Sequence, residues 1–368
     1  MSKKKVLILG KLPPPYMGPS IGTEIMLRSA LNDHFELLHL NTKANYTIKT
    51  MGKWSFYKLM KNIMIYFDLS RIIRRKKPDL ILIPISQTTL GFVKDSFFLI
   101  ISKVFKKKMI LHFLGGDFKE WVERSSPATR IYVKRILSFS KGVIVLGNNL
   151  KYHFEKYFTD ERIFVIPNGA NYTIPARTAS QNHSTRIIWV SSLMVSKGIE
   201  DVLQALTLLK KERMQMFDLK IVGSWGDDRL RDRCLQWIAE HQLPVEFSLP
   251  GVSNEIKLQE LSNADIFVFT PREQEGQPWV IVEAMAAGLP VISTDRGAIA
   301  EAVRDQQNGF IVERYAAQQI AEKIKYLMSQ PEIKKTMGNN SRKIYLDNYT
   351  EDKMVAKFKD CFNKLLEA

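Results

Sequence analysis

Short runs of apolar, mostly β-branched residues recur along this chain and alternate with longer segments in which apolar residues have helical spacing. In the N-terminal part, the runs predict strands at residues 6–9, 35–38, 79–83, 108–113, 142–146 and 162–166. The longer segments predict helices near 55–75, 91–105, 128–139 and 150–157. A loop rich in Pro and Gly runs from Gly10 to Gly22 and leads into a helix ending near Leu31. This alternation is typical of an α/β domain with a parallel sheet.

The same alternation restarts in the second half of the chain. Strands are predicted at 187–190, 219–222, 245–249, 266–269 and 291–293, and helices at 198–211, 229–240, 317–329, 332–346 and 351–366. The polar stretch from Thr178 to Thr185 has no apolar periodicity and is the predicted linker. We therefore expect two Rossmann-like domains, residues 1–172 and 184–350, followed by a helix in residues 351–368. Ligands of such domains bind beyond the carboxyl ends of the strands.

Charge is distributed unevenly between the two predicted domains. The chain of 368 residues has a net charge of +16, yet residues 1–172 contain 29 Lys and Arg against 12 Asp and Glu, and the remainder 25 against 26. Within residues 43–77 there are ten cations and one acid, Asp68, interleaved with Trp54, Phe56, Tyr57, Met60, Ile63, Met64, Tyr66 and Phe67. This segment suits an anionic membrane surface, but an ordinary crossover helix with solvated cations, or a nucleic-acid site, would show the same charge. We expect the membrane surface and no nucleic acid.

Cysteine content and hydropathy bear on the cellular compartment. Cys234 and Cys361 have no motif spacing, which indicates a reducing compartment and argues against a zinc site. No apolar run approaches the roughly 20 residues that span a bilayer, and the N-terminus leads into only a short apolar strand. We expect a cytoplasmic protein that lies peripherally on the inner face of the cytoplasmic membrane.

Residues 275–292, EGQPWVIVEAMAAGLPVI, carry the most specific chemistry. Glu275 and Glu283 stand eight apart, with a Gly-Gln-Pro turn after the first, a small-residue helix expected after the second, and then an apolar strand. Backbone N–H groups that open a helix suit a phosphate, whereas a glutamate suits hydroxyl groups. A nucleotide sugar offers both. The alternative is a buried βαβ unit with two solvated glutamates.

This stretch resembles the EX7E motif of the retaining GT-B glycosyltransferases of glycosyltransferase family 4. The resemblance implies an α/β fold of the GT-B type, with two Rossmann-like domains facing across a cleft and a last helix that crosses back to the first domain. It also implies transfer of a sugar, with retained anomeric configuration, from a nucleoside-diphosphate sugar, UDP being the expected carrier. The acceptor would be a lipid-linked or cell-surface glycan in capsule, O-antigen or lipopolysaccharide assembly.

The resemblance assigns donor-binding roles residue by residue. Lys197, in the segment SSLMVSKGI, matches the lysine that binds the donor diphosphate, and Ser192 stands where the family has an arginine. Glu283 would hold the ribose hydroxyls and Glu275 the donor sugar. Where many members read Gly-Phe-Gly, this chain reads Gly276-Gln277-Pro278, and Pro278 supplies no N–H. The remaining expected donor contacts are Gly223 and Val252 near the base and Gly18 near the phosphate.

Catalytic and acceptor-side residues are also implied. Glu275, Lys197 and His112 are the expected catalytic residues; His112 lies two residues before the family position, which Leu114 holds, and its alternative role is core packing. Asp117 is the acceptor-side candidate. Arg272 and Arg229 are candidates to supply the positive charge of the missing arginine, since both lie on loops that could reach the cleft.

The chain contains no Asp-x-Asp, so we expect a metal-independent reaction without a cofactor. The proposed front-face mechanism of the family needs no protein nucleophile. Two further classes stay open: an enzyme of the same fold with other chemistry, such as a nucleotide-sugar epimerase or a phosphorylase, and a basic nucleic-acid-binding protein.

Overall fold

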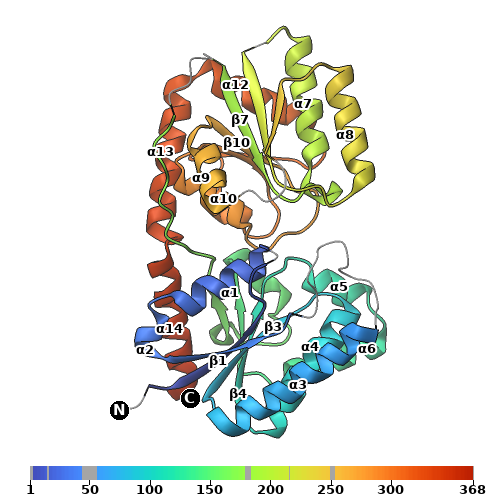
Figure 1. The fold of residues 1–368 in the computed structure, drawn as a ribbon, viewed down its shortest axis with the longest axis vertical. Coiled ribbons are helices and arrows are strands. Elements are labelled where there is room, and N and C mark those ends of the chain that lie inside the picture. Colours follow the sequence, from blue (N-terminus) through green and yellow to red (C-terminus); the bar gives the residue numbers. More distant parts are fainter. Residues whose placement is uncertain are drawn as a thin grey trace. The chain divides into compact units, whose positions relative to one another are not determined.

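The chain divides into two compact units in the computed structural model, which describes residues 3–14, 16–43, 56–178, 184–214, 216–248 and 253–367 (Figure 1). Unit 1 comprises Met1–Ala170 and Glu351–Ala368, and unit 2 comprises Asn171–Thr350. The chain passes from unit 1 to unit 2 two residues before the expected end of the first domain at residue 172. Most of the expected linker, residues 179–183, lies outside the described residues.

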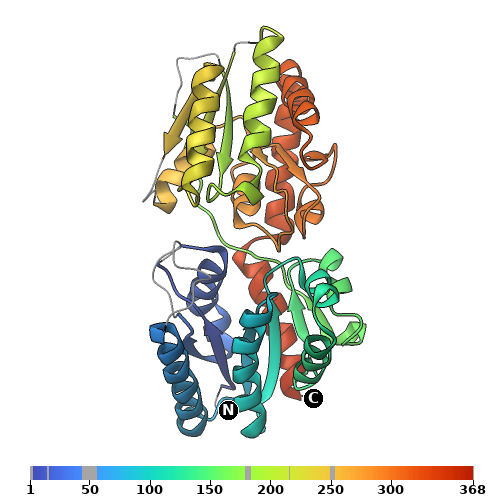
Figure 2. The same ribbon diagram turned by 90° about the vertical axis from the view of Figure 1, so that its right-hand side faces the viewer.

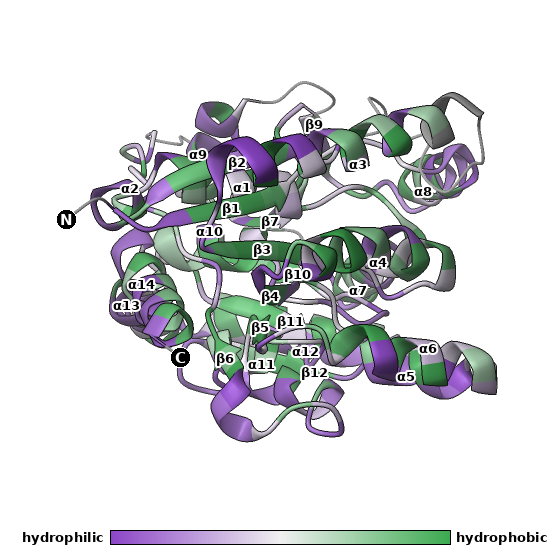
Figure 3. Ribbon diagram, turned by 90° about the horizontal axis from the view of Figure 1, so that it is seen from below, coloured by the Kyte–Doolittle hydropathy of each residue, from purple (hydrophilic) through white to green (hydrophobic). Residues whose placement is uncertain are grey.

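Unit 1 is built on a sheet of six parallel strands in the order β2-β1-β3-β4-β5-β6. Each strand lies where the apolar runs predicted it, to within three residues at either end: β1 (Lys5–Gly10), β2 (Glu36–Asn41), β3 (Leu80–Ile85), β4 (Lys108–Phe113), β5 (Val143–Val145) and β6 (Ile163–Val165). The central strands are hydrophobic along their length because helices cover both of their faces (Figure 3).

One face of this sheet is covered by α1 (Gly18–Arg28), α2 (Leu31–His34) and α14 (Glu351–Glu367). Phe358 and Phe362 of α14 belong to the same buried cluster as Ile8, Leu82 and Ile110 of the strands. The chain's last helix therefore completes the core of unit 1, as the resemblance implied. The other face carries α3 (Phe56–Lys76), α4 (Thr89–Val104), α5 (Phe118–Arg124) and α6 (Pro127–Leu137); α3, α4 and α6 lie side by side in front of the sheet in Figure 2.

The prediction of a helix at residues 150–157 is wrong. The chain instead forms a 3-10 turn, η2 (Asn148–His153), and a second short turn, η3 (Asp160–Arg162), precedes β6. Leu150, Phe154 and Phe158 are all buried, so their helical spacing reflects packing of a tight turn against the sheet. The amide of Phe154 donates to the carbonyl of Lys151, a three-residue spacing that an α-helix does not use.

Unit 2 also has six parallel strands, in the order β12-β11-β10-β7-β8-β9. They are β7 (Thr185–Val190), β8 (Phe217–Val222), β9 (Val245–Ser248), β10 (Ile266–Phe269), β11 (Val291–Thr294) and β12 (Gly309–Val312). One face carries α7 (Ile199–Lys211), α8 (Asp228–Glu240) and α12 (Ala317–Ser329), and the other α9 (Asn254–Ser262), α10 (Trp279–Ala286) and α13 (Pro331–Asn348). The short α11 (Ile299–Ala302) follows β11.

Several features of unit 2 were not predicted correctly. The small-residue helix expected after Glu283 begins earlier, at Trp279, so that Glu283 lies in its second turn. Helix α9 and strand β12 were missed, because α9 has no clear apolar stripe and β12 has only four residues. Helix α9 matters for function, because it supplies a side chain to the site described below.

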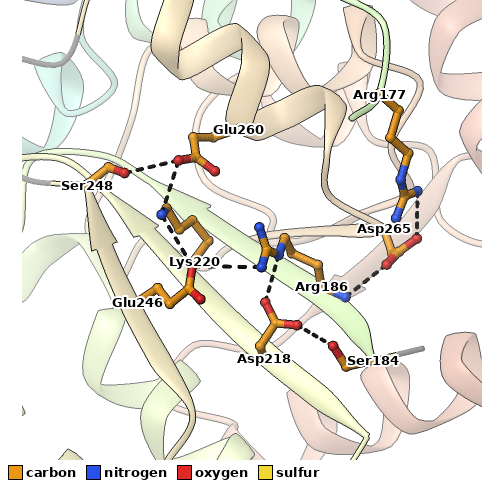
Figure 4. Close-up of polar contacts among 9 residues, drawn as sticks. All are labelled: Arg177, Ser184, Arg186, Asp218, Lys220, Glu246, Ser248, Glu260 and Asp265. Atoms are coloured by element: carbon orange, nitrogen blue, oxygen red, sulfur yellow. Dashed lines mark hydrogen bonds and ion pairs between the residues drawn. The ribbon is translucent and has the colours of Figure 1, made fainter. Parts of the chain in front are cut away.

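A charged network lies on one face of strands β7, β8 and β9 (Figure 4). The side chain of Arg186 donates to Asp218 at 2.8 Å, in the register that pairs these residues across the strands. Lys220 lies between Glu246 at 3.4 Å and Glu260 of α9 at 3.1 Å. Hydropathy alone does not predict such charges in a parallel sheet. Each is paired, which the largely buried Lys220 and Asp218 require.

Candidate functional site

The carboxyl ends of β7 and β10 mark the place where a ligand is expected in unit 2. From β7 the chain proceeds to β8 and β9 on one side, then returns to place β10 on the other side of β7. The connections after β7 and β10 therefore leave the sheet in opposite directions, and the space between them is the usual binding position of doubly wound sheets.

Lys197 and Glu275 meet at this position. Lys197 ends a 3-10 turn, η4 (Val195–Lys197), in the connection after β7, and Glu275 lies in the connection after β10. The ammonium group of Lys197 forms an ion pair with Oε1 of Glu275, although 78 positions separate the two residues. Their side chains are 24% and 15% exposed, so the pair is partly shielded yet reachable from solvent. The structure thus brings together two of the three expected catalytic residues.

Two glycines hold these connections in place. Gly198 has φ +77, and a Cβ there would lie 1.9 Å from the carbonyl oxygen of Thr270 at the end of β10. Gly297, with φ +57, would place a Cβ 1.9 Å from the carbonyl oxygen of Glu275. Only glycine permits both the backbone angle and the approach. The segments that carry Lys197 and Glu275 are therefore braced by neighbouring backbone rather than by side chains.

Glu283 is almost completely buried, with 2% of its side chain exposed. Its Oε1 accepts hydrogen bonds from the ammonium group of Lys257 on α9 and, at 3.4 Å, from the hydroxyl of Tyr172. Its Oε2 is buried and has no hydrogen-bond partner among the described residues. Burial, followed by the charge of Glu283, raises the pKa of Tyr172 well above its usual value, so this hydroxyl stays a donor. A buried carboxylate oxygen without a partner is a place for a ligand hydroxyl.

The residues between the two glutamates open α10. Gly276 accepts a hydrogen bond from the amide of Ala298 at 2.8 Å, and Gln277 is buried. Pro278 is the N-cap of α10, where its missing N–H costs nothing. The helix has no side-chain cap and no acidic residue in its first turn. Its N-terminus is therefore compatible with an anion.

The other residues of unit 2 that are expected to bind the donor are Ser192, Gly223 and Val252. Ser192 is exposed in the connection after β7. Gly223 follows β8, and a Cβ there would lie 1.8 Å from the carbonyl oxygen of Ser191, so the two connections are in contact. Val252 lies outside the described residues. The donor roles of all these residues stay predictions.

The arginines suggested as substitutes for the missing family arginine differ in their surroundings. Arg272 donates to Asp201 at 2.7 and 2.9 Å and to Glu200 at 2.9 Å. These hydrogen bonds to Asp201, outweighing the effect of burial, raise its pKa above the usual value. Its guanidinium group is thus engaged by two carboxylates of α7. Arg229 is exposed in the first turn of α8.

The residues expected in unit 1 do not form a comparable cluster. Gly18, expected in a loop, is the first residue of α1. His112 faces α14, with its ring 5.8 Å from that of Phe358, and burial lowers its pKa to about 4. This position supports core packing, the alternative role. Asp117 precedes α5 and forms an ion pair with Arg124 at 2.5 Å.

Two residues of the site, Lys257 and Tyr172, were missed by sequence reasoning. Lys257 lies on the helix that was not predicted, and Tyr172 follows a turn signal without any motif of its own. Within the described residues, no group of three or more His, Cys, Asp or Glu could hold a metal ion. None of the described helices is both long and apolar enough to cross a bilayer.

Comparison with known proteins shows what the part of the chain that carries this site is similar to. The family described as Glycosyl transferases group 1 matches residues 172–344, which is most of unit 2. Unit 2 is therefore similar to a group 1 glycosyltransferase domain. The chain is 24% identical over 256 residues to the uncharacterized glycosyltransferase MJ1178 of Methanocaldococcus jannaschii, covering 70% of this chain and 68% of the relative. It is 27% identical over 186 residues to the capsular polysaccharide biosynthesis glycosyltransferase CapM of Staphylococcus aureus, covering 50% of this chain and 48% of that protein.

Solved structures extend the comparison beyond unit 2. Anabaena HepE in complex with UDP has a TM-score of 0.76 at 16% identity, covering 98% of this chain and all of that chain. A glycosyltransferase from Rickettsia africae has a TM-score of 0.75 at 19% identity, covering 100% of this chain and 99% of that one. With two parallel six-stranded sheets, the chain has the GT-B type of fold that the resemblance implied.

Proposed function

We propose that this chain is a retaining glycosyltransferase that uses a nucleoside-diphosphate sugar. The observation that carries the proposal is the meeting of Lys197 and Glu275 at the carboxyl ends of β7 and β10, within the residues that match the group 1 family. In this ion pair each group neutralises the other. A bound donor would separate them, because its diphosphate attracts the lysine and its sugar hydroxyls donate to the carboxylate.

Glu283 would bind the ribose of the donor through Oε2, the oxygen that has no partner among the described residues. Lys257 and Tyr172 would keep the carboxylate in place through Oε1. The N-terminus of α10 would add partial positive charge next to the diphosphate. As the leaving diphosphate develops charge, Lys197 would stabilise it, and no metal ion is needed in this proposal.

The acceptor is proposed to be a lipid-linked or cell-surface glycan intermediate, at the inner face of the cytoplasmic membrane. CapM is named for capsular polysaccharide biosynthesis, and a 31%-identical relative from Escherichia coli, matched over 45% of this chain, is a putative colanic acid biosynthesis glycosyltransferase. HepE was solved with UDP, which makes a UDP-sugar the first donor to test. Capsule, O-antigen and lipopolysaccharide intermediates are the acceptors to compare.

Donor binding and turnover test the proposal separately. UDP-, GDP-, ADP- and dTDP-sugars should be compared by thermal shift, since a ligand of the native state raises the melting temperature. With the donor found, Lys197→Met and Glu275→Gln should each lower turnover roughly a hundredfold. Lys343→Met, which breaks an exposed ion pair with Asp347 in the same unit, is the control and should leave turnover unchanged.

Product analysis tests the finer claims. The anomeric configuration of the product, read by NMR, should match that of the donor, and chelation with EDTA should leave the rate unchanged. Conversion of the donor sugar without any acceptor would indicate an epimerase instead. Full activity of both site variants would show that Lys197 and Glu275 do not form the active site.

A further inference from the structure

The outer side of helix α3 presents apolar side chains to solvent. Met60, Met64 and Phe67 are spaced four and three residues apart, so they form one stripe along the helix, and all three are exposed. Phe67 is 72% exposed. The opposite side of the same helix is buried through Ile65, Leu69 and Ile73, which face the core.

Helix α4 continues this surface. Leu90, Val93, Phe97 and Val104 are exposed and are spaced for a second stripe. The ring of Tyr66 on α3 lies 5.3 Å from that of Phe97, and the Tyr66 hydroxyl donates to the carbonyl of Lys94 at 2.9 Å, so the two helices are in contact. Ile131, 72% exposed on the neighbouring α6, extends the surface further. We call the exposed apolar residues of these three helices the outer helix face.

Exposed large hydrophobic residues are concentrated on the outer helix face. Of the 18 exposed large hydrophobic residues in the described parts, half lie on α3, α4 and α6: Met60, Ile63, Met64, Phe67, Leu90, Val93, Phe97, Val104 and Ile131. Scattered single apolar residues on a surface are normal, but a gathering on adjacent helices indicates an interaction surface.

Charge on the same helices indicates which partner this surface has. Together, α3, α4 and α6 contain eleven Lys and Arg residues and only two acids. One of these acids, Asp95, is buried and accepts from the amide of Ser86. Along α3, the apolar stripe is followed by Arg71 and Arg75, both exposed, four and eight residues after Phe67. Apolar side chains next to cations are complementary to a layer of acyl chains beneath anionic headgroups.

We propose that the outer helix face of unit 1 binds an anionic lipid bilayer. The apolar stripes enter the boundary between headgroups and acyl chains, while the cations on the same helices bind lipid phosphates. Through this surface, a glycosyltransferase of the proposed function would reach a lipid-linked acceptor at the membrane. The inference rests on that proposed function, which is the reason to expect a membrane partner. Binding to vesicles needs neither donor nor turnover, so the two proposals can fail independently.

Sedimentation of the full chain with vesicles tests this. Vesicles of phosphatidylglycerol mixed with phosphatidylcholine should bind the chain, and vesicles of phosphatidylcholine alone should bind it far less. Met64→Ser combined with Phe67→Ser should weaken binding roughly tenfold or more, because two apolar side chains no longer enter the bilayer. Leu235→Ser combined with Leu346→Ser removes two exposed apolar side chains of unit 2 and should have no effect.

The cations are tested in the same way. Arg71→Gln combined with Arg75→Gln should weaken binding to the anionic vesicles about tenfold and make it less sensitive to salt. Lys211→Gln with Lys335→Gln, exposed residues of unit 2, is the matched control. All these positions are exposed, so circular dichroism should show unchanged folding. The proposal is overturned if the wild-type chain does not bind anionic vesicles, or if the outer-face variants bind as well as the wild type.

Discussion

The substitution Lys257→Met removes a charge from unit 2 while roughly preserving the length of the side chain. Glu283 would then keep a buried carboxylate whose remaining partner is the hydroxyl of Tyr172 at 3.4 Å. Only 2% of the Glu283 side chain and 15% of the Lys257 side chain are exposed, so water screens this pair poorly. The loss of Lys257 should therefore have a large effect on stability.

Removing one partner of a buried ion pair typically costs about 3–5 kcal/mol, because the other charge stays buried without compensation. In a domain of the size of unit 2, each kcal/mol lowers the melting temperature by roughly 2–4 °C, which gives a decrease of roughly 6–20 °C. Lys257→Arg keeps the positive charge, so its free energy of unfolding should fall much less. The control is Lys343→Met, whose ion pair with Asp347 is 76% and 55% exposed and should contribute less than about 0.5 kcal/mol.

Scanning calorimetry measures the transition of unit 2 in each variant. The double variant Lys257→Met with Glu283→Gln has no charge left at this pair. Its loss of stability should therefore be smaller than the sum of the two single losses, by on the order of 2 kcal/mol. The reasoning is refuted if Lys257→Met is no less stable than Lys343→Met, or if the two single losses simply add.

Three further outcomes follow from the structure. Burial lowers the pKa of His112 to about 4, whereas a histidine in the unfolded chain has a pKa of ~6.5. Between these pH values the unfolded chain binds more protons than the folded chain. The free energy of unfolding therefore falls as the pH drops from about 6.5 to 4. His112→Leu should remove up to roughly 3 kcal/mol of that loss, as measured by urea unfolding across this range. Gly297→Ala should lower the free energy of unfolding by roughly 2 kcal/mol or more. Gly288 also has a positive φ, but a Cβ there would have its nearest contact at 3.6 Å, so Gly288→Ala should lower the free energy of unfolding less in the same assay. Burial raises the pKa of Cys234 to about 12, so a maleimide should label it slowly in the native chain at pH 8 and quickly in urea.

The sheets were predictable because each parallel strand is buried on both faces and so appears as a continuous apolar run. Strand β4 was predicted at its observed limits, Lys108–Phe113. Apolar spacing was less reliable in short connections, where Leu150 and Phe154 are buried by a 3-10 turn rather than by a helix. Lys220, within an apolar run, is held between two carboxylates that only the folded sheet brings to it.

For the candidate site, the spacing of Glu275 and Glu283 predicted a donor site in unit 2, and in the structure Glu275 lies at the carboxyl ends of the strands, paired with Lys197. Contacts across the fold were not predictable in the same way. The Lys257–Glu283 pair joins two helices, and a lysine on α9 looks like any solvated lysine in the sequence. The surroundings of His112 were not predictable either, because the sequence does not show that α14 packs against the strand that carries it.

The division of unit 1 between the two ends of the sequence has a consequence for synthesis on the ribosome. Unit 2 is one uninterrupted stretch, whereas the buried cluster of unit 1 includes Phe358 and Phe362, which are translated after all of unit 2. Until α14 is made, this face of the unit 1 sheet is covered only by α1 and α2, whereas unit 2 already has all of its residues. In a chain truncated after Thr350 and released from the ribosome, unit 2 should accordingly resist protease while unit 1 should be cleaved.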